Sequence, residues 1–384
     1  MRDDTWKEDL HFLAEEMQKI HPNLFFALSK RDFEQAVKKI EASIPQLTDE
    51  QIIVELIKLV ALPSVTGGRD GHSYVPIFQK ATGFRALPLK LNAFSDGWFV
   101  VNAREPYQEL VRKRLVRVGD VRIEDVATSL NPLVSRDNGT SLKARLGTFF
   151  LIPEILRAVG IIKSIDAVDL ELANKDEHFI SVQPISGEAY ESWETAIWQQ
   201  PENFRAELLE PSTLLISYNA VRDKTQSGES MTQFCERLES LLKETETTRV
   251  IVDIRQNGGG NNLTYRPLLE FLSRDALNQT GKLFILISRH TFSAAGNFAA
   301  ELMQKTKALF VGEPMGGGIN QYGDSVPVNL PNSDLMVRIA SRYWQMSSAD
   351  DERLTITPDI VVELSSKDFF AGFDSVLTAV LESE

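Results

Sequence analysis

Apolar residues near the N-terminus recur every three or four positions, the spacing of one face of an α-helix. Three successive runs show this spacing, at residues 6–20, 33–44 and 52–60. Thr48 and Gln51 stand before the third run in capping-box spacing, which allows each side chain to bond the other residue's backbone N–H. The pattern predicts a helical N-terminal region that extends to about residue 62.

Short apolar runs separated by turn residues follow, and between residues 87 and 157 they predict a small, separate β-rich module. In the second half of the chain, apolar strands alternate with helical stretches, which is typical of an α/β core. The clearest of these strands lie at 213–221, 249–254 and 283–288. We therefore expect three parts: a helical region at 1–83, a β-rich module at 84–160 and an α/β core at 161–384.

The composition is that of an ordinary folded protein, with 43% hydrophobic and 25% charged residues among 384. The net charge of -13 argues against nucleic acid as a partner, because a phosphate backbone is bound by clustered Lys and Arg. No apolar run is long enough to predict an integral membrane segment. The acidic first residues do not resemble an export signal, and the cellular compartment is left open.

Metal and disulfide chemistry are not expected from this sequence. The single cysteine, Cys235, excludes an intrachain disulfide and any site built from several cysteines. Apolar neighbours at helical spacing predict that its thiol is packed in a core. A zinc-peptidase His-Glu-x-x-His motif is also absent, so we expect neither a metal nor an organic cofactor.

A glycine turn follows the strand at 250–254, where Gly258, Gly259 and Gly260 are consecutive. Backbone N–H groups in such a turn are not screened by side chains and can donate to a developing anion. A phosphate could use the same groups, but the Lys-Ser/Thr of a P-loop is missing. A plain strand-to-helix turn explains the glycines equally well.

Ser293 lies where a second strand, at 283–287, passes into a segment of small residues that opens an apolar helix. A serine there would stand at the positive end of a helix dipole, which favours negative charge on its adduct. The alternative is that Ser293 simply caps the helix, as most serines at this position do.

Four motifs in order resemble peptidase family S41, which includes the C-terminal processing peptidases and the tricorn core protease. They are Asp253-x-Arg255-x-Asn257-x-Gly259-Gly260, Thr291-Phe292-Ser293-Ala294-Ala295, Val311-Gly312-Glu313-Pro314 and Pro358-Asp359-Ile360. The resemblance covers most of residues 165–384. It implies a crotonase-like α/β core and, at 84–160, a PDZ-like module that positions an extended substrate.

The resemblance also implies roles for individual residues. Ser293 matches the nucleophile, and the oxyanion donors match the N–H of Ala294 and of Gly259 or Gly260. Processing peptidases place a lysine base after the Gly-Glu turn, but this chain has Gly317 at that position.

The tricorn-like branch uses a histidine from an upstream loop and a later glutamate, which match His72 and Glu352. A neutral imidazole, with an unperturbed pKa of ~6.5, can accept the serine proton and pass it to the leaving amine. This chain departs from the pattern at Gly71, where tricorn has a serine, and at Gly296, where processing peptidases commonly have a polar residue.

His290 is the main rival base, because it is only three residues from Ser293. His11 and His21 lie in and at the end of the first predicted helix and are interpreted as ordinary structural or surface residues.

The sequence thus predicts a serine peptidase that cleaves extended or unfolded polypeptides through an acyl-enzyme. An inactive peptide-binding relative and a crotonase-type acyl-CoA enzyme remain as alternatives.

Overall fold

The structure, a computed structural model, describes residues 1–173, 177–198, 202–209 and 212–383. The chain forms two compact units. The first comprises residues 1–137, 142–198 and 322–343, and the second comprises residues 138–141, 199–321 and 344–384. The three-part division expected from the sequence stays a prediction, and each unit is described by itself.

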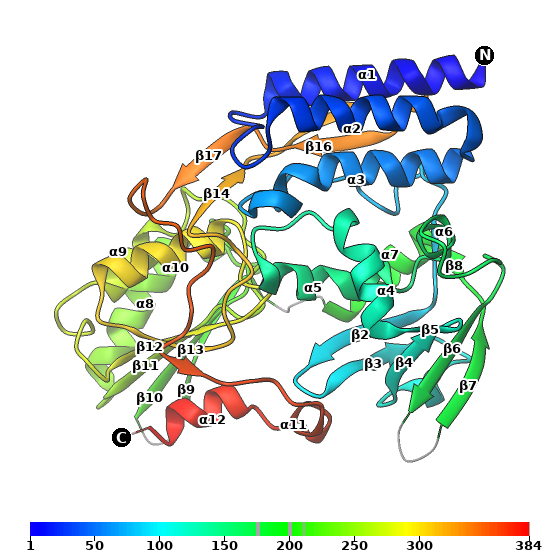
Figure 1. Cartoon of the computed structure of the whole chain (residues 1–384). Coiled ribbons are helices and arrows are strands. Elements are labelled where there is room, and N and C mark those ends of the chain that lie inside the picture. The colour runs from blue at the N-terminus through cyan, green and yellow to red at the C-terminus, as the bar shows by residue number, and fades with distance from the viewer. Residues whose placement is uncertain (174–176, 199–201, 210–211, 384) are drawn as a thin grey trace. The chain divides into compact units, whose positions relative to one another are not determined.

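Three helices begin the first unit: α1 (Arg2–Ile20), α2 (Lys30–Ser43) and α3 (Asp49–Gly67), followed along the chain in Figure 1. The apolar stripe of α1 is buried, and α3 has both hydrogen bonds of the capping box between Thr48 and Gln51. The helical N-terminal region is confirmed. The third helix continues to Gly67, five residues beyond the predicted limit.

The first unit also contains an antiparallel sheet with the strand order β2-β3-β4-β6-β7. Its strands are β2 (Leu89–Phe94), β3 (Gly97–Ala103), β4 (Arg114–Val118), β6 (Val168–Ala173) and β7 (Glu177–Val182), and β5 (Val121–Arg122) pairs with β4. Short pairings add β1 (Arg85–Ala86) with β8 (Ile185–Ser186) and β15 (Val326–Asn329) with β16 (Met336–Ile339).

The expectation of a separate β-rich module between residues 87 and 157 is wrong in two respects. Residues 123–158 are largely helical, and two strands of the sheet come from beyond residue 160. The spacing of Ile123, Val126 and Leu130 is that of a helix face, and pairing with a distant strand leaves no local signal. The remaining α-helices of this region are α4 (Ile123–Leu130), α5 (Gly139–Phe149), α6 (Pro153–Ala158) and α7 (Gly187–Trp198). Three short 3₁₀ helices are η1 (Ile44–Gln46), η2 (Gln108–Leu110) and η3 (Asn131–Leu133).

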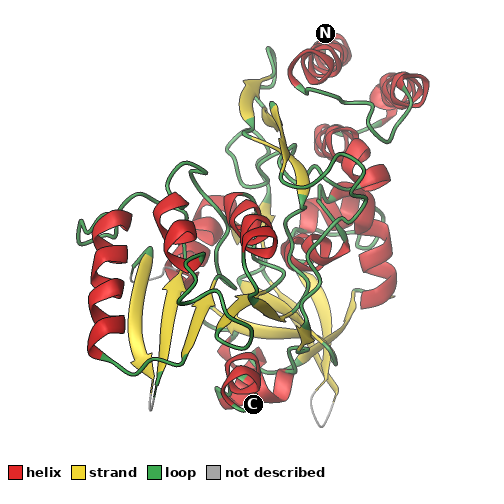
Figure 2. Ribbon diagram, turned by 90° about the vertical axis from the view of Figure 1, so that its left-hand side faces the viewer, coloured by secondary structure: helices red, strands yellow, loops and turns green. Residues whose placement is uncertain are grey.

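The second unit is built on a sheet with the order β18-β13-β12-β11-β10-β9, in which all strands are parallel except β9 (Figure 2). The strands are β9 (Phe204–Leu209), β10 (Thr213–Tyr218), β11 (Arg249–Asp253), β12 (Leu283–Ile287), β13 (Leu309–Gly312) and β18 (Ile360–Val361). The helices are α8 (Met231–Glu244), α9 (Arg266–Leu272), α10 (Ala294–Lys305), α11 (Ser366–Ala371) and α12 (Ser375–Leu381). Strands β14 (Asn320–Gly323) and β17 (Arg342–Gln345) pair where the chain passes between the units. The predicted mixed α/β class and its three clearest strands are confirmed.

Alternation along β10 divides its side chains between the two faces of this sheet. Leu214 and Ile216 belong to the cluster that includes residues of α8, α9 and α10, whereas Leu215 belongs to the cluster with α12. Cys235 of α8 is buried in the first of these clusters, as predicted, and burial raises the pKa of its thiol to about 12. Its thiol is therefore an inert packing group.

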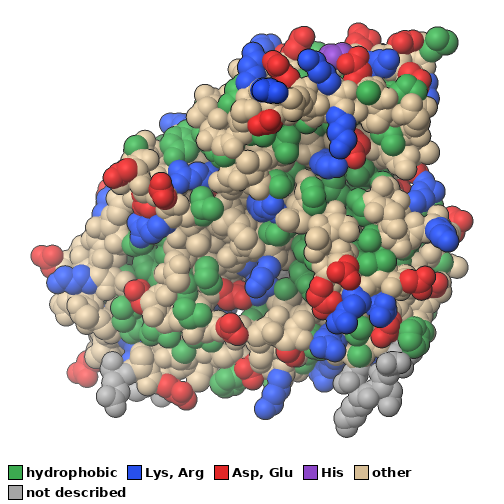
Figure 3. Space-filling model, in the orientation of Figure 1, with side chains coloured by type: hydrophobic (Ala, Val, Ile, Leu, Met, Phe, Trp, Pro, Cys, Tyr) green, Lys and Arg blue, Asp and Glu red, His purple; other side chains and the backbone are tan. Residues whose placement is uncertain are grey.

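The surface carries charges of both signs. On the face drawn in Figure 3, basic and acidic side chains are interspersed. Among the described residues, no helix is both long and apolar enough to cross a bilayer.

Candidate active site

Ser293 is held in a strained conformation at the start of α10. Its φ is +55° and its ψ is −127°, a region that residues with a side chain rarely adopt. It occupies the N-cap position, yet its side chain makes no capping hydrogen bond to the helix. The interpretation of Ser293 as a simple helix cap is therefore wrong. Strain of this kind, at a half-buried serine between a strand and a helix, is typical of a functional group.

The glycine turn after β11 lies directly against this serine. A Cβ atom at Gly259 would lie 2.7 Å from Cβ of Ser293 and 2.8 Å from the backbone N of Ala294. Gly259 has a φ of +103°, which also favours glycine. Only a residue without a side chain allows this approach.

The backbone N–H of Ala294 and that of Gly259 or Gly260 were predicted to hold an oxyanion. That of Gly259 already donates to Oδ1 of Asn257, at 2.9 Å. Ala294 occupies the first position of α10, where an N–H has no partner within the helix. Within the described part of the chain, the structure records no acceptor for the N–H of Ala294 or of Gly260.

A buried amide network supports Ser293 from within the second unit. Nε2 of Gln321 lies 3.2 Å from the Ser293 carbonyl oxygen and 3.0 Å from Oδ1 of Asn297. Asn297 in turn donates to Asn262 at 2.8 Å. The sequence analysis missed both Gln321 and Asn297, because an isolated amide residue in an apolar segment carries no recognisable signal.

Most other residues of the four motifs are scaffold. Arg255 bonds both oxygens of Asp253 and both oxygens of Asp374, the residue that caps α12. These bonds fasten the end of β11 to a helix on the other face of the sheet. Glu313 forms an ion pair with the buried Arg289, and Asp359 accepts the backbone N–H of Phe310.

Asn138 is a third residue that the sequence analysis missed. Its Nδ2 lies 3.0–3.4 Å from four carbonyl oxygens, those of Met315, Gly316, Gly317 and Leu354. Its Oδ1 accepts two backbone N–H groups at the start of α5. The Asn138 side chain therefore holds together the loop at residues 315–317, here called the glycine loop, the backbone at Leu354 and the start of α5.

The glycine loop held by Asn138 packs on the segment that carries the serine. Gly317 occupies the place of the processing-peptidase lysine, and its N–H donates to the carbonyl of Thr291 at 2.8 Å. A Cβ there would lie 3.2 Å from Cα of Phe292 and 3.4 Å from the N of Ser293. Glu352, the predicted orienting residue, is exposed and lies in a loop of the second unit.

His72 belongs to the first unit, on a loop that many hydrogen bonds hold in place. Asp70 Oδ1 accepts the backbone N–H of His72 at 3.2 Å and that of Ser73 at 2.9 Å. The N–H of Gly71 donates to Asp137, and its carbonyl accepts from Arg145. Every one of these bonds fixes the loop's backbone, so the sequence folds here into one defined shape.

The surroundings of His72 keep its imidazole neutral. Burial and then the charge of Arg145 lower the pKa of His72 to about 4, although Asp70 and a hydrogen bond to the Tyr322 backbone act in the opposite direction. The charge of Arg338 lowers it further. Part of the residue stays exposed, but its Nδ1 atom is removed from water. A neutral ring is the state that a general base requires.

The rival base, His290, has an exposed side chain at the end of the β12 segment. His11 is exposed and lies 3.3 Å from Glu41. His21 is buried, with 4% of its surface exposed, and it belongs to the surroundings of the His72 loop.

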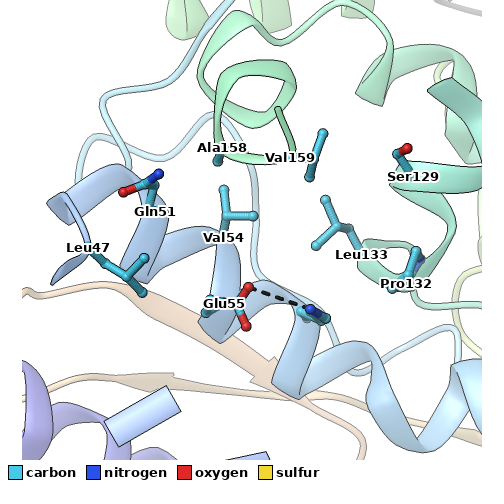
Figure 4. A pocket seen from close by; sticks show the side chains of 10 residues that line it. Leu47, Gln51, Val54, Glu55, Ser129, Pro132, Leu133, Ala158 and Val159 are labelled. Carbon is cyan, nitrogen blue, oxygen red and sulfur yellow. Dashed lines mark ion pairs between the residues drawn. The ribbon is translucent and has the colours of Figure 1, made fainter. Parts of the chain in front are cut away.

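A cavity of about 290 Å³ lies apart from these groups in the first unit, between α3 and residues 129–133 and 158–159 (Figure 4). Its rim carries the ion pair of Glu55 with Lys58, 3.5 Å apart. Its lining includes Ser129 but no histidine.

The serine half of the site has the features of a serine hydrolase: a strained serine at a helix start and adjacent backbone N–H groups. Residues 264–362 match the sequence profile of peptidase family S41. No curated protein sequence matches the chain. The region that carries Ser293 is therefore similar to this family, and the chain is by class a serine-type peptidase.

Solved structures show the same fold along almost the whole chain. Mature CPAF complexed with lactacystin is 13% identical, with a TM-score of 0.66, and the match covers 99% of this chain and 97% of that one. A second structure of mature CPAF is 14% identical, with a TM-score of 0.66 and coverage of 95% and 94%. The photosystem II D1 C-terminal processing protease is 14% identical, with a TM-score of 0.43 and coverage of 93% and 92%.

Proposed function

We propose that this peptidase cleaves extended or unfolded polypeptides through an acyl-enzyme on Ser293, with His72 as general base and Glu352 orienting it. The observation that carries the proposal is the conformation of Ser293, which is strained and not used as a helix cap. Strain is retained where function needs it.

In the proposed mechanism, His72 takes the proton of the Ser293 hydroxyl as its oxygen attacks the peptide carbonyl. The N–H groups of Ala294 and Gly260 donate to the oxyanion. The imidazolium then gives its proton to the leaving amine, and water activated by the same ring clears the acyl group. Ser293 belongs to the second unit and the His72 loop to the first.

A fluorophosphonate probe tests this assignment directly, since it forms an adduct only with an activated serine. Intact-mass and peptide-level mass spectrometry should place one adduct on Ser293, and His72→Ala should slow its formation by about 10²-fold or more. A protein without an adduct would instead support the inactive peptide-binding or acyl-CoA alternatives.

We also propose that the core is crotonase-like and that the sheet of the first unit acts as a PDZ-like clamp for extended peptide. Strand β7 is an edge of that sheet, and Phe179 on it is 70% exposed. A substrate strand can pair with such an edge. Phe179→Ser should raise KM for an unfolded protein more than for a short peptide. Leu208→Ser on edge strand β9 is the matched control and should change neither value.

A further inference from the structure

His21 and Asp70 are two buried titratable residues that the proposed mechanism does not use. Their side chains are 0% and 1% exposed, and Nε2 of His21 lies 3.3 Å from Oδ2 of Asp70. Buried ionisable groups are rare unless they are paired, so this contact needs an explanation.

The ring of His21 is oriented by its other nitrogen. Nδ1 accepts the backbone N–H of Asn23 at 3.2 Å. A ring nitrogen that accepts a hydrogen bond carries no proton, so the proton lies on Nε2, the nitrogen 3.3 Å from Oδ2 of Asp70.

Asp70 transmits this contact to the loop of His72. Its Oδ1 accepts the backbone N–H groups of His72 and Ser73. Burial alone would raise the pKa of Asp70, but the bonds from His21 and Ser73 outweigh burial and hold the pKa below its usual range. Asp70 is therefore a carboxylate that fixes the backbone of His72.

Tyr322, whose backbone bonds to the His72 ring, also contacts His21. The rings of His21 and Tyr322 lie 4.4 Å apart at an angle of 48°. The N–H of Tyr322 donates to the carbonyl of Arg69 at 2.7 Å. The His72 ring donates a hydrogen bond to the Tyr322 backbone, and this bond raises the pKa of the imidazole. Asp70 and Tyr322, which hold His72 from two sides, thus share His21 as a common neighbour.

We propose that His21 is a positioning residue for the general base: it fixes Asp70 and Tyr322, and through them the loop and ring of His72. The inference rests on the proposed function, in which His72 serves Ser293. The proline after His21 ends α1 and places the ring at this point.

Two substitutions separate the contributions of the ring and of its donor. His21→Phe keeps a ring against Tyr322 but loses the donor to Asp70. His21→Gln keeps an N–H at the Nε2 position but loses the ring. His11→Phe is the matched control, because the His11 side chain is 51% exposed and lies 3.3 Å from Glu41 on the surface.

The rate of fluorophosphonate labelling at Ser293 and the separate values of kcat and KM are the readouts. His21→Phe should lower the labelling rate and kcat by about tenfold or more with KM unchanged, because a general base supplies ~10²–10⁴-fold and depends on geometry. His21→Gln should recover most of this loss, and His11→Phe should match the wild type. His21→Phe with the wild-type labelling rate would overturn the inference.

Asp70→Asn and the wild-type protein keep the test decisive if His21→Phe does not fold. Asp70→Asn is isosteric and places an amide donor against the donor of His21, so it should reproduce the loss. In the wild type, ¹⁵N NMR of the His21 ring should show the proton on Nε2, and a proton on Nδ1 would refute the pair. A wild type without an adduct, or rapid labelling of His72→Ala, would refute the proposed function and this inference with it. Slow labelling of His72→Ala together with wild-type labelling of Asp70→Asn would refute the inference alone.

Discussion

Gly259 and Ser293 approach so closely that a methyl group on the glycine would lie 2.7 Å from Cβ of the serine. The glycine turn is therefore not a generic strand-to-helix connection. Because Gly259 has no side chain, the backbone at the end of β11 can lie against Ser293, which follows the next parallel strand, β12.

The first prediction concerns this contact. Gly259→Ala should reduce peptidase activity by about 10²-fold or more, because the new methyl group displaces Ser293 from its oxyanion donors. Gly258→Ala is the matched control, since a Cβ there meets no atom within 4 Å. Steady-state kinetics on an unfolded protein should show near wild-type activity for this control. Equal losses in both variants would contradict the geometry.

Substitutions at Ser293 should affect hydrolysis and thermal stability in different ways. Ser293→Ala should abolish hydrolysis and leave the melting temperature nearly unchanged, because alanine has the same difficulty at a φ of +55°. Ser293→Gly should also be inactive but more stable by about 1 kcal/mol, since glycine adopts this backbone without strain. Thermal unfolding of the two variants measures the difference. An Ala variant as stable as the Gly variant would show that the strain is absent.

The fall of kcat/KM at low pH, the acid limb of the pH profile, should report the protonation of His72. Only the neutral ring accepts a proton, and it is neutral above its pKa, so kcat/KM should fall as the pH drops through about 4. Arg145→Met removes a positive charge that disfavours the protonated ring, so the limb should move to higher pH. Arg145→Lys keeps the charge and should leave the limb near the wild-type position. A limb near 6.5 in the wild type would contradict the role of burial.

We expect the Nδ2 donor of Asn138 to contribute more to stability and activity than the Oδ1 atom that caps α5. Asn138→Asp keeps the oxygen that caps α5 but turns a second oxygen toward four carbonyl groups, so it should lower stability by about 1–3 kcal/mol and also lower kcat. Asn138→Ser also keeps a capping oxygen and adds no charge, so its loss should be smaller. Denaturant unfolding and kinetics on both variants check this order. An Asp variant with wild-type stability would show that the amide is dispensable.

Local patterns in the sequence determined the elements of this protein. The apolar spacing of α1 to α3, the capping box at Thr48 and three strands of the parallel sheet were predicted, because each depends on residues a few positions apart. The candidate nucleophile was also predicted, since a serine between a strand and a helix has a local signature.

Only the tertiary structure decided what surrounds those residues. The helix-face spacing in α4 was a local signal, but the sequence could not indicate that the sheet of the first unit is completed by strands from beyond residue 160. Asn138 and His21 were missed for the same reason. Asn138 meets carbonyl groups 177 to 216 positions away, and His21 meets Asp70 and Tyr322, 49 and 301 positions away. Contacts at such separations follow from how the whole chain packs, and no periodicity in the sequence records them.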